Sequence, residues 1–220
     1  MFENTSTLTV TEPMLTELRA SLADTMSKKR YRHTLAVEEM VLRLGELFVH
    51  DEQIMRLRAA ALLHDITKEY SVEQQLALCA AYGIRVSSID MYAPKTFHAR
   101  TAAAVIPDRY PDFADDTVIK CVRWHTTGHA GMTTCEKLVY LADYIDMSRE
   151  FEDCVRLRDF FFSADPQMMS RDDRKNHLRE TLILSYDMTI QALIREKTPI
   201  SPDTLAARNE LILRREQAGL

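Results

Sequence analysis

Two places in this sequence put acidic or imidazole side chains where an apolar helix would otherwise continue. Asp143 lies within the apolar run 138–145, and the pair His64-Asp65 directly follows the apolar run 59–63. Burying an ionised carboxylate is costly unless it is paired with a cation or bound to a metal. Each place therefore indicates either a structural salt bridge or a metal ligand, and neither place alone distinguishes the two.

The candidate ligands form an ordered set along the chain, each within an expected helix or near the end of one. The set is His33, His64-Asp65, His98, His125 and Asp143. A mixed shell of imidazoles and carboxylates suits iron, manganese, zinc, cobalt or nickel better than calcium. Six ligands are enough for one or two divalent or trivalent ions, and a two-metal site is suited to phosphoryl chemistry.

Helices are expected to position these residues, because the chain has only 5 Gly and 7 Pro and its apolar residues recur with helical spacing. The helix that follows His98 is predicted to end at Pro107 and Pro111. The pattern predicts helices over 14–26, 33–48, 54–63, 71–83, 98–107, 115–124, 133–145, 151–162 and 172–197, and a last one that begins at 201–203.

Local signals mark several of these boundaries. Residues 71–74 and 133–136 have the spacing of capping boxes, and Gly83 suits the left-handed conformation that often ends a helix. Residues 84–96 show no sustained period, so they are predicted to form a loop. All of the expected regular structure is helical, which predicts an all-α protein.

Composition excludes several classes of partner. The formal net charge of -5 provides no global attraction for nucleic acid or anionic membranes. The basic stretch 171–179 is interleaved with acidic residues and is interpreted as a solvated helix face.

The chain begins without the features of a secretory signal, and no apolar run approaches the roughly 18 residues of a spanning helix. We therefore expect a cytoplasmic protein.

The cysteines are scattered and show no C-x-x-C spacing. They are Cys79, Cys121, Cys135 and Cys154. Reduced cysteine behaves as a small apolar residue and is often buried. We expect four free, buried thiols in a reducing compartment.

The order H, HD, H, H, D resembles that of the HD superfamily of metal-dependent phosphohydrolases. Five motifs extend the match: Arg30-x-x-His33-Thr34-Leu35, residues 62–68 (LLHDITK), residues 125–128 (HTTG), residues 140–145 (YLADYI) and residues 202–209 (PDTLAARN). Together they are similar to one bacterial subfamily, the HD-type symmetrical bis(5′-nucleosyl)-tetraphosphatases. The resemblance implies a single helical HD-type domain over 28–212, with an N-terminal helical extension over 1–27 and a C-terminal tail over 213–220.

The resemblance also implies roles for individual residues. His33, His64, Asp65 and Asp143 would bind the main metal, with iron the expected ion, while His98 and His125 would complete a second metal position or contact phosphate. Asp65, Lys68, His98 and His125 are the candidate catalytic residues. Substrate contacts are implied for the ligands His33, Asp65, His98, His125 and Asp143, and for Arg30, Thr126, Thr127, Gly128, Arg149, Thr204 and Arg208.

The implied reaction is attack of a metal-activated water on a dinucleoside tetraphosphate, which would cut diadenosine tetraphosphate symmetrically into two ADP. Two alternatives stay open: an HD-type nucleotidase or deoxynucleotide phosphohydrolase, and a non-catalytic module that senses nucleotides. The expected partner is a small-molecule nucleotide, and a homodimer is left open.

His129 stands where a basic residue is expected, whereas His50 and His177 fit no part of the pattern and are interpreted as solvated or capping histidines.

Overall fold

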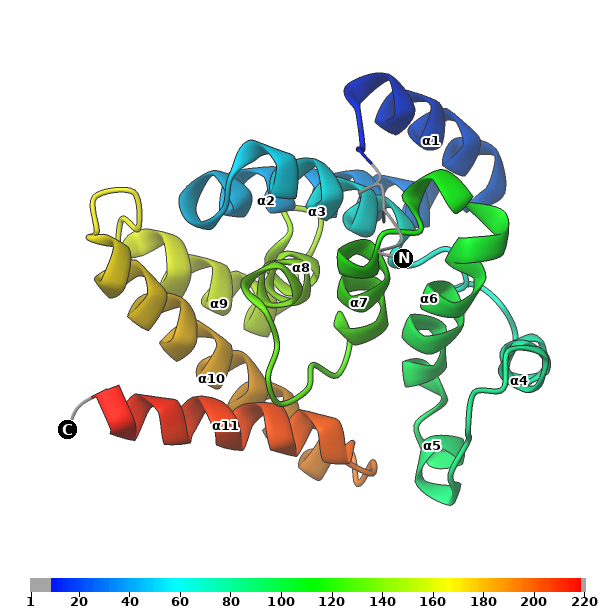
Figure 1. Cartoon of the computed structure of the whole chain (residues 1–220). Helices are drawn as coiled ribbons and strands as arrows, with labels where there is room; N and C mark the ends of the chain where they lie inside the picture. The colour runs from blue at the N-terminus through cyan, green and yellow to red at the C-terminus, as the bar shows by residue number, and fades with distance from the viewer. Residues whose placement is uncertain (1–8, 219–220) are drawn as a thin grey trace, which may run out of the picture.

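The structure is a computed structural model that describes residues 9–218, and it is built of helices (Figure 1). Residues 1–8 and 219–220, which belong to the expected N-terminal extension and C-terminal tail, lie outside the described residues. No strand forms within residues 9–218, which confirms the all-α prediction. The helices are α1 (Glu12–Thr25), α2 (Lys28–Phe48), α3 (Asp51–Leu63), α4 (Val72–Ala81), α5 (Ser88–Tyr92), α6 (Phe97–Arg109), α7 (Asp116–Trp124), α8 (Thr134–Ile145), α9 (Glu152–Ser163), α10 (Arg171–Arg195) and α11 (Pro202–Ala218), with 3-10 turns η1 (Pro94–Thr96) and η2 (Pro111–Phe113).

The predicted caps of α4 and α8 are both present. The side chain of Thr133 accepts a hydrogen bond from the Glu136 backbone, and the Glu136 carboxylate accepts one from the Thr133 backbone at 2.8 Å. Ser71 and Gln74 form the same reciprocal pair before α4. These contacts satisfy backbone N–H groups that a helix start leaves unpaired. The start of α8, the helix that carries Asp143, is therefore fixed by local sequence.

Two sequence-based predictions were wrong. The expected loop 84–96 contains α5 and η1, because Ser87 and Asp90 form a further capping box that stabilises one helical turn. Pro107 does not end α6 but lies inside it, and the helix continues to Arg109. Proline removes one backbone hydrogen bond, and here the loss falls near the end of a helix that is anchored by buried residues such as Ile106.

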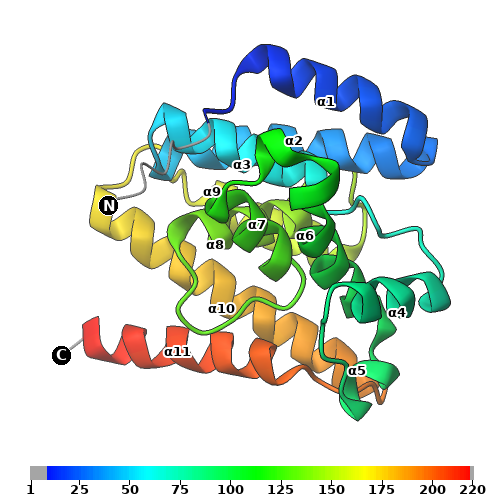
Figure 2. The ribbon, with the colours of Figure 1, turned by 45° about the vertical axis from the view of Figure 1, so that its right-hand side comes forward.

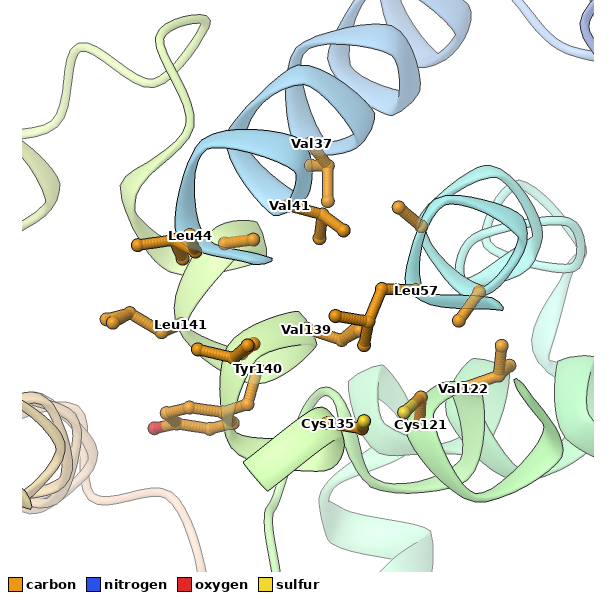
Figure 3. Packing of buried hydrophobic residues seen from close by; sticks show 14 of the residues in the cluster. Val37, Val41, Leu44, Leu57, Cys121, Val122, Cys135, Val139, Tyr140 and Leu141 are labelled. Carbon is orange, nitrogen blue, oxygen red and sulfur yellow. The ribbon is translucent and has the colours of Figure 1, made fainter. Parts of the chain in front are cut away.

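Helix α8 lies at the centre of the bundle, and α2, α3 and α7 pack around it (Figure 1). Figure 3 shows Val41 of α2, Leu57 of α3, Val122 of α7 and Val139 of α8 turned toward one another. All four side chains are fully buried. Burial of one such side chain stabilises a fold by roughly 1.5–3 kcal/mol. The helices that carry the candidate ligands are thus held together by apolar packing as well as by the site itself.

The cysteines agree with the sequence prediction. All four are free and buried within the described chain. Cys121 and Cys135 lie in the apolar layer between α7 and α8 (Figure 3). Burial raises the pKa of the Cys121 thiol well above its usual value. These thiols act as packing groups.

Helix α1 joins the same core through Leu15, Leu18 and Leu22. An ion-pair network fastens it as well. The buried carboxylate of Glu38 on α2 accepts hydrogen bonds from Arg19 of α1, at 2.8 and 2.6 Å, and from Arg58 of α3, at 3.0 Å. A buried carboxylate is tolerated when it is compensated in this way. The network ties α1 to the two helices that carry His33 and His64.

Helices α10 and α11 pack against each other on the side of α8 opposite α2 (Figure 2). The loop 125–133 runs toward them, and Thr204 of α11 donates a hydrogen bond to the Thr127 carbonyl at 3.0 Å. This loop, which connects α7 to α8, is therefore also held by α11. Among the described helices, none has the length and apolar character needed to cross a membrane.

Candidate metal centre

Four predicted ligands converge from α2, from the end of α3 and from α8. The Nε2 atom of His33 lies 3.0 Å from Oδ1 of Asp143 and 3.8 Å from Oδ2 of Asp65. The Nε2 atom of His64 lies 3.2 Å from that same Asp65 oxygen and 3.7 Å from Oδ1 of Asp143. Such separations are typical of ligands that share one ion, since transition metals hold nitrogen and oxygen ligands at about 2.0–2.2 Å.

A second group of donors shares Asp65 with the first. Its Oδ1 atom lies 3.2 Å from Nε2 of His98 and 3.7 Å from Nε2 of His125. Those two Nε2 atoms are 3.0 Å apart. One Asp65 oxygen thus faces His33 and His64, and the other faces His98 and His125. A carboxylate placed in this way would be able to hold two neighbouring ions, one through each oxygen.

The surroundings of the donor atoms support the fit to a metal. His33 Nε2, His64 Nε2 and Asp65 Oδ1 are buried, and their polar contacts are with other candidate donors rather than with the rest of the described protein. Buried polar atoms in folded proteins nearly always have a partner, and a shared metal ion would be one. The donors are imidazole nitrogens and carboxylate oxygens, which suit a transition metal. The residues present therefore fit the metal that the sequence predicted.

Backbone carbonyls fix the orientation of three of the histidine rings. In each ring, Nδ1 lies close to the carbonyl oxygen of the residue three positions earlier: 2.6 Å for His64, 2.8 Å for His98 and 2.7 Å for His125. A carbonyl can only accept, so each Nδ1 carries the proton and each Nε2 offers its lone pair to the centre. This orienting contact is the usual one for metal-binding histidines.

Asp146 is a site residue that the sequence analysis missed. It is fully buried, and its Oδ2 atom lies 3.3 Å from Nδ1 of His33. Burial lowers the pKa of His33, but hydrogen bonds with Asp143 and Asp146 outweigh burial and raise that pKa to about 9. The signal was present, because Asp143 and Asp146 are three residues apart and so lie on one side of the end of α8.

Cations offset the negative charge of the centre. Arg30 forms an ion pair with Asp65, and Arg149 forms one with Asp143. Burial alone would raise the pKa of both carboxyl groups, but His64 beside Asp65 and Arg149 beside Asp143 hold them well below their usual values. The salt bridge considered for Asp143 is therefore real, and it coexists with a position among the metal donors.

The remaining polar groups of the centre lie around His98. Burial lowers the pKa of His98 to about 4 and also lowers that of His125, so both rings are neutral and able to bind a metal. The Lys68 ammonium lies 3.1 Å from Nε2 of His98. The Thr126 hydroxyl lies 3.1 Å from Nε2 of both histidines. Lys68 and Thr126 thus lie within hydrogen-bonding distance of the candidate donors.

Two cavities adjoin the centre and divide the predicted substrate residues between them. A cavity of about 370 Å³ beside His33 is lined by Arg30 and Arg149. A second cavity, of about 300 Å³, is lined by Thr126, Thr127 and Thr204. The structure therefore divides the substrate contacts implied by the resemblance between two cavities.

Two predicted substrate residues are engaged elsewhere. The Arg208 guanidinium on α11 donates to Asp187 of α10 at 2.6 Å. The backbone N–H of Gly128 donates to the Trp124 carbonyl at 2.9 Å, as part of the turn that ends α7. The Gly128 N–H would have to give up that contact to bind a phosphate, whereas only the Nε atom of Arg208 is engaged by Asp187.

The three other histidines have local partners or are exposed. His129, where a basic residue was expected, lies with its Nε2 atom 2.9 Å from Glu136. His177 lies with Nε2 2.9 Å from the Phe161 carbonyl. His50 is exposed and occupies the N-cap position of α3.

Comparisons with known proteins agree with this geometry. A family model described as HD domain matches residues 30–148. A symmetrical bis(5′-nucleosyl)-tetraphosphatase of Halalkalibacterium halodurans is 30% identical over 188 residues, which cover 86% of this chain and 91% of that protein. A protein of the same description from Bacillus subtilis is 28% identical, covering 89% of this chain and 96% of its own length.

A solved structure shares the fold. It comes from Clostridium acetobutylicum and is described as a predicted HD superfamily hydrolase involved in NAD metabolism. It superposes with a TM-score of 0.77 and 28% sequence identity, covering 90% of this chain and 97% of that one. The helical arrangement that surrounds the donors is therefore shared over nearly the whole length of both chains.

Proposed function

Because this chain belongs to the HD-domain family, we propose that it hydrolyses dinucleoside tetraphosphates and cuts diadenosine tetraphosphate symmetrically into two ADP. One observation carries the proposal: two groups of metal donors share the carboxylate of Asp65. Relatives that match most of the chain are described as symmetrical tetraphosphatases. Iron is the proposed ion, with manganese, zinc, cobalt and nickel as substitutes, and the cytoplasm is the proposed location.

The donor residues prepare the site for a metal. An ion bound there would lower the pKa of water toward neutrality and offset charge on phosphoryl oxygens. His64, His98 and His125 already present their Nε2 lone pairs in the required direction. Asp146 holds the His33 ring in place from the far side.

The cations of the site then act on the substrate. Arg30 and Arg149 pair with Asp65 and Asp143 in the metal-free arrangement. When those carboxylates bind a metal, the guanidinium groups can turn to phosphate oxygens, which they bind in bidentate fashion. Lys68, next to His98, can donate to the same phosphates. These residues would place phosphorus beside the donors and neutralise the departing diphosphate.

Product analysis tests the proposal. Metal-loaded protein is incubated with diadenosine tetraphosphate, and an early time point is separated by chromatography. We expect ADP without matched AMP and ATP, and no products with an Asp65→Asn variant purified in the same way. Equal AMP and ATP would contradict symmetrical cleavage. Turnover of mononucleotides or deoxynucleotides alone would favour a nucleotidase, and binding without turnover would favour a sensing module.

A further inference from the structure

The cavity beside His33 has the charge and shape of a nucleotide subsite separate from the one that Thr126 and Thr204 line. We propose that it binds the second nucleoside diphosphate half of the substrate, with the base stacked on Phe151 and the phosphates held by Lys29 and Arg32. The inference rests on the proposed function and deepens it.

The two cavities lie next to different donors of the centre. His33 faces the Oδ2 atom of Asp65, whereas His98 faces the Oδ1 atom of the same carboxylate. One cavity is lined in part by His33. The other is lined in part by Thr126, whose hydroxyl contacts His98. The cavities therefore adjoin opposite sides of the centre. A substrate with two equal halves that is cut in the middle needs a binding surface on each side of the cleaved bond.

Basic side chains gather at the cavity beside His33. Lys29, Arg32 and His33 are spaced i, i+3 and i+4 on α2, so they lie on one side of that helix. Lys29 and Arg32 form no ion pair within residues 9–218, whereas Arg30 and Arg149 are paired at the metal centre. Four lysine or arginine side chains and one acidic side chain line this cavity of a chain with a net charge of -5. Such a local excess of cations suits a polyphosphate.

An exposed aromatic ring lines each cavity. Phe151 is 72% exposed and lines the cavity beside His33. Tyr92 is 75% exposed and lines the cavity beside Thr126. Aromatic side chains stack on nucleobases with little dependence on the base. The volume of each cavity, about 370 and 300 Å³, lies within the usual range for small-molecule sites.

Phe151→Ala tests the inference, because this variant should bind the two-part substrate less well but should bind a single ADP as the wild-type protein does. We expect kcat/KM for diadenosine tetraphosphate to fall roughly 5- to 100-fold, since a stacking ring is lost. The inhibition constant of ADP should change little, because ADP keeps the cavity lined by Tyr92. Tyr92→Ala should weaken ADP inhibition instead.

Matched variants keep the result interpretable. Phe151→Tyr retains an aromatic ring and should keep kcat/KM near the wild-type value. Phe160→Ala removes an exposed phenylalanine within α9, away from the cavity lining, and should have no effect. The double variant Lys29→Ala, Arg32→Ala should make kcat/KM less sensitive to salt. Unchanged kcat/KM in Phe151→Ala, or a parallel loss of ADP inhibition in that variant, would overturn the second subsite. Absence of turnover by the wild-type protein would instead overturn the proposed function.

Discussion

Oδ1 of Asp65 lies 3.2 Å from Nε2 of His98, so the carboxylate that follows α3 reaches the histidine at the start of α6. Its other oxygen lies 3.2 Å from Nε2 of His64. Each Asp65 oxygen thus belongs to a different group of donors. Loss of this one carboxylate should affect both groups, whereas loss of a histidine should affect only one.

Asp65→Asn should remove bound metal and activity while the protein stays folded. The substitution preserves side-chain volume, and the apolar packing of α2, α3, α7 and α8 does not depend on Asp65. The loss of metal affinity should exceed the roughly 10–100-fold that is typical when an outer-shell partner is removed. Elemental analysis and circular dichroism measure the two properties. Wild-type metal content in a folded variant would contradict the assignment.

His98→Ala and His125→Ala should each reduce turnover strongly yet leave one tightly bound metal. His33, His64, Asp143 and Oδ2 of Asp65 would still surround the first position. Metal-to-protein ratios measured together with kinetics test this division. Complete metal loss in both variants would show that the centre is one cooperative unit.

Asp146→Asn should lower metal affinity by roughly 10–100-fold without removing any donor atom from the centre. Asp146 orients His33 through its Nδ1 atom, and an uncharged amide would hold that ring less firmly. Ser148→Ala is the comparison, because it removes the hydroxyl that donates to Asp146 and lies 3.4 Å from His33 Nδ1 but keeps the Asp146 carboxylate. Its effect on metal affinity should be smaller. Equal affinities for Asp146→Asn and the wild-type protein would exclude the orienting role.

The six candidate donors could be proposed from the sequence because their residue types and order carry chemical information, and the structure brings their side chains together. Asp143, an acidic residue in an apolar helix, indicated a salt bridge or a ligand, and its Oδ1 atom lies beside both Arg149 and His33. Reciprocal capping at Thr133 and Glu136 likewise depends on residues three apart. Such features are local, so the sequence alone is enough to identify them.

Features that depend on how helices pack were not predictable in the same way. The pairing of Arg208 with Asp187 depends on the relative placement of α10 and α11. The separation of Arg149 from Thr204 into two cavities depends on where α11 and the segment between α8 and α9 lie around the centre. Asp146 could have been suspected from its spacing, but its contact with His33 requires the packing of α2 against α8.

Gly128 illustrates how a residue suspected of binding phosphate can have a packing reason for its identity. Its φ is +61°, and an added Cβ would lie 1.9 Å from the Tyr186 hydroxyl oxygen. Gly83 has a similar φ of +63° but no atom within 4 Å of an added Cβ. Gly83→Ala should therefore cost only the left-handed backbone conformation, about 1–2 kcal/mol. Gly128→Ala should cost a further 1–3 kcal/mol, roughly, for displacing Tyr186.

A double-mutant cycle with Tyr186→Phe separates the two costs. The Tyr186 hydroxyl is buried and has no hydrogen-bond partner in the described structure, so removing it alone should change stability little. In the Gly128→Ala background it removes the closest atom, and part of the lost stability should return. Recovery should be incomplete, because Cζ of Tyr186 would still lie 3.0 Å from the new Cβ. Urea unfolding of the four proteins gives the coupling free energy. Equal losses for Gly128→Ala and Gly83→Ala, with no coupling to Tyr186, would show that the backbone conformation alone requires glycine at position 128.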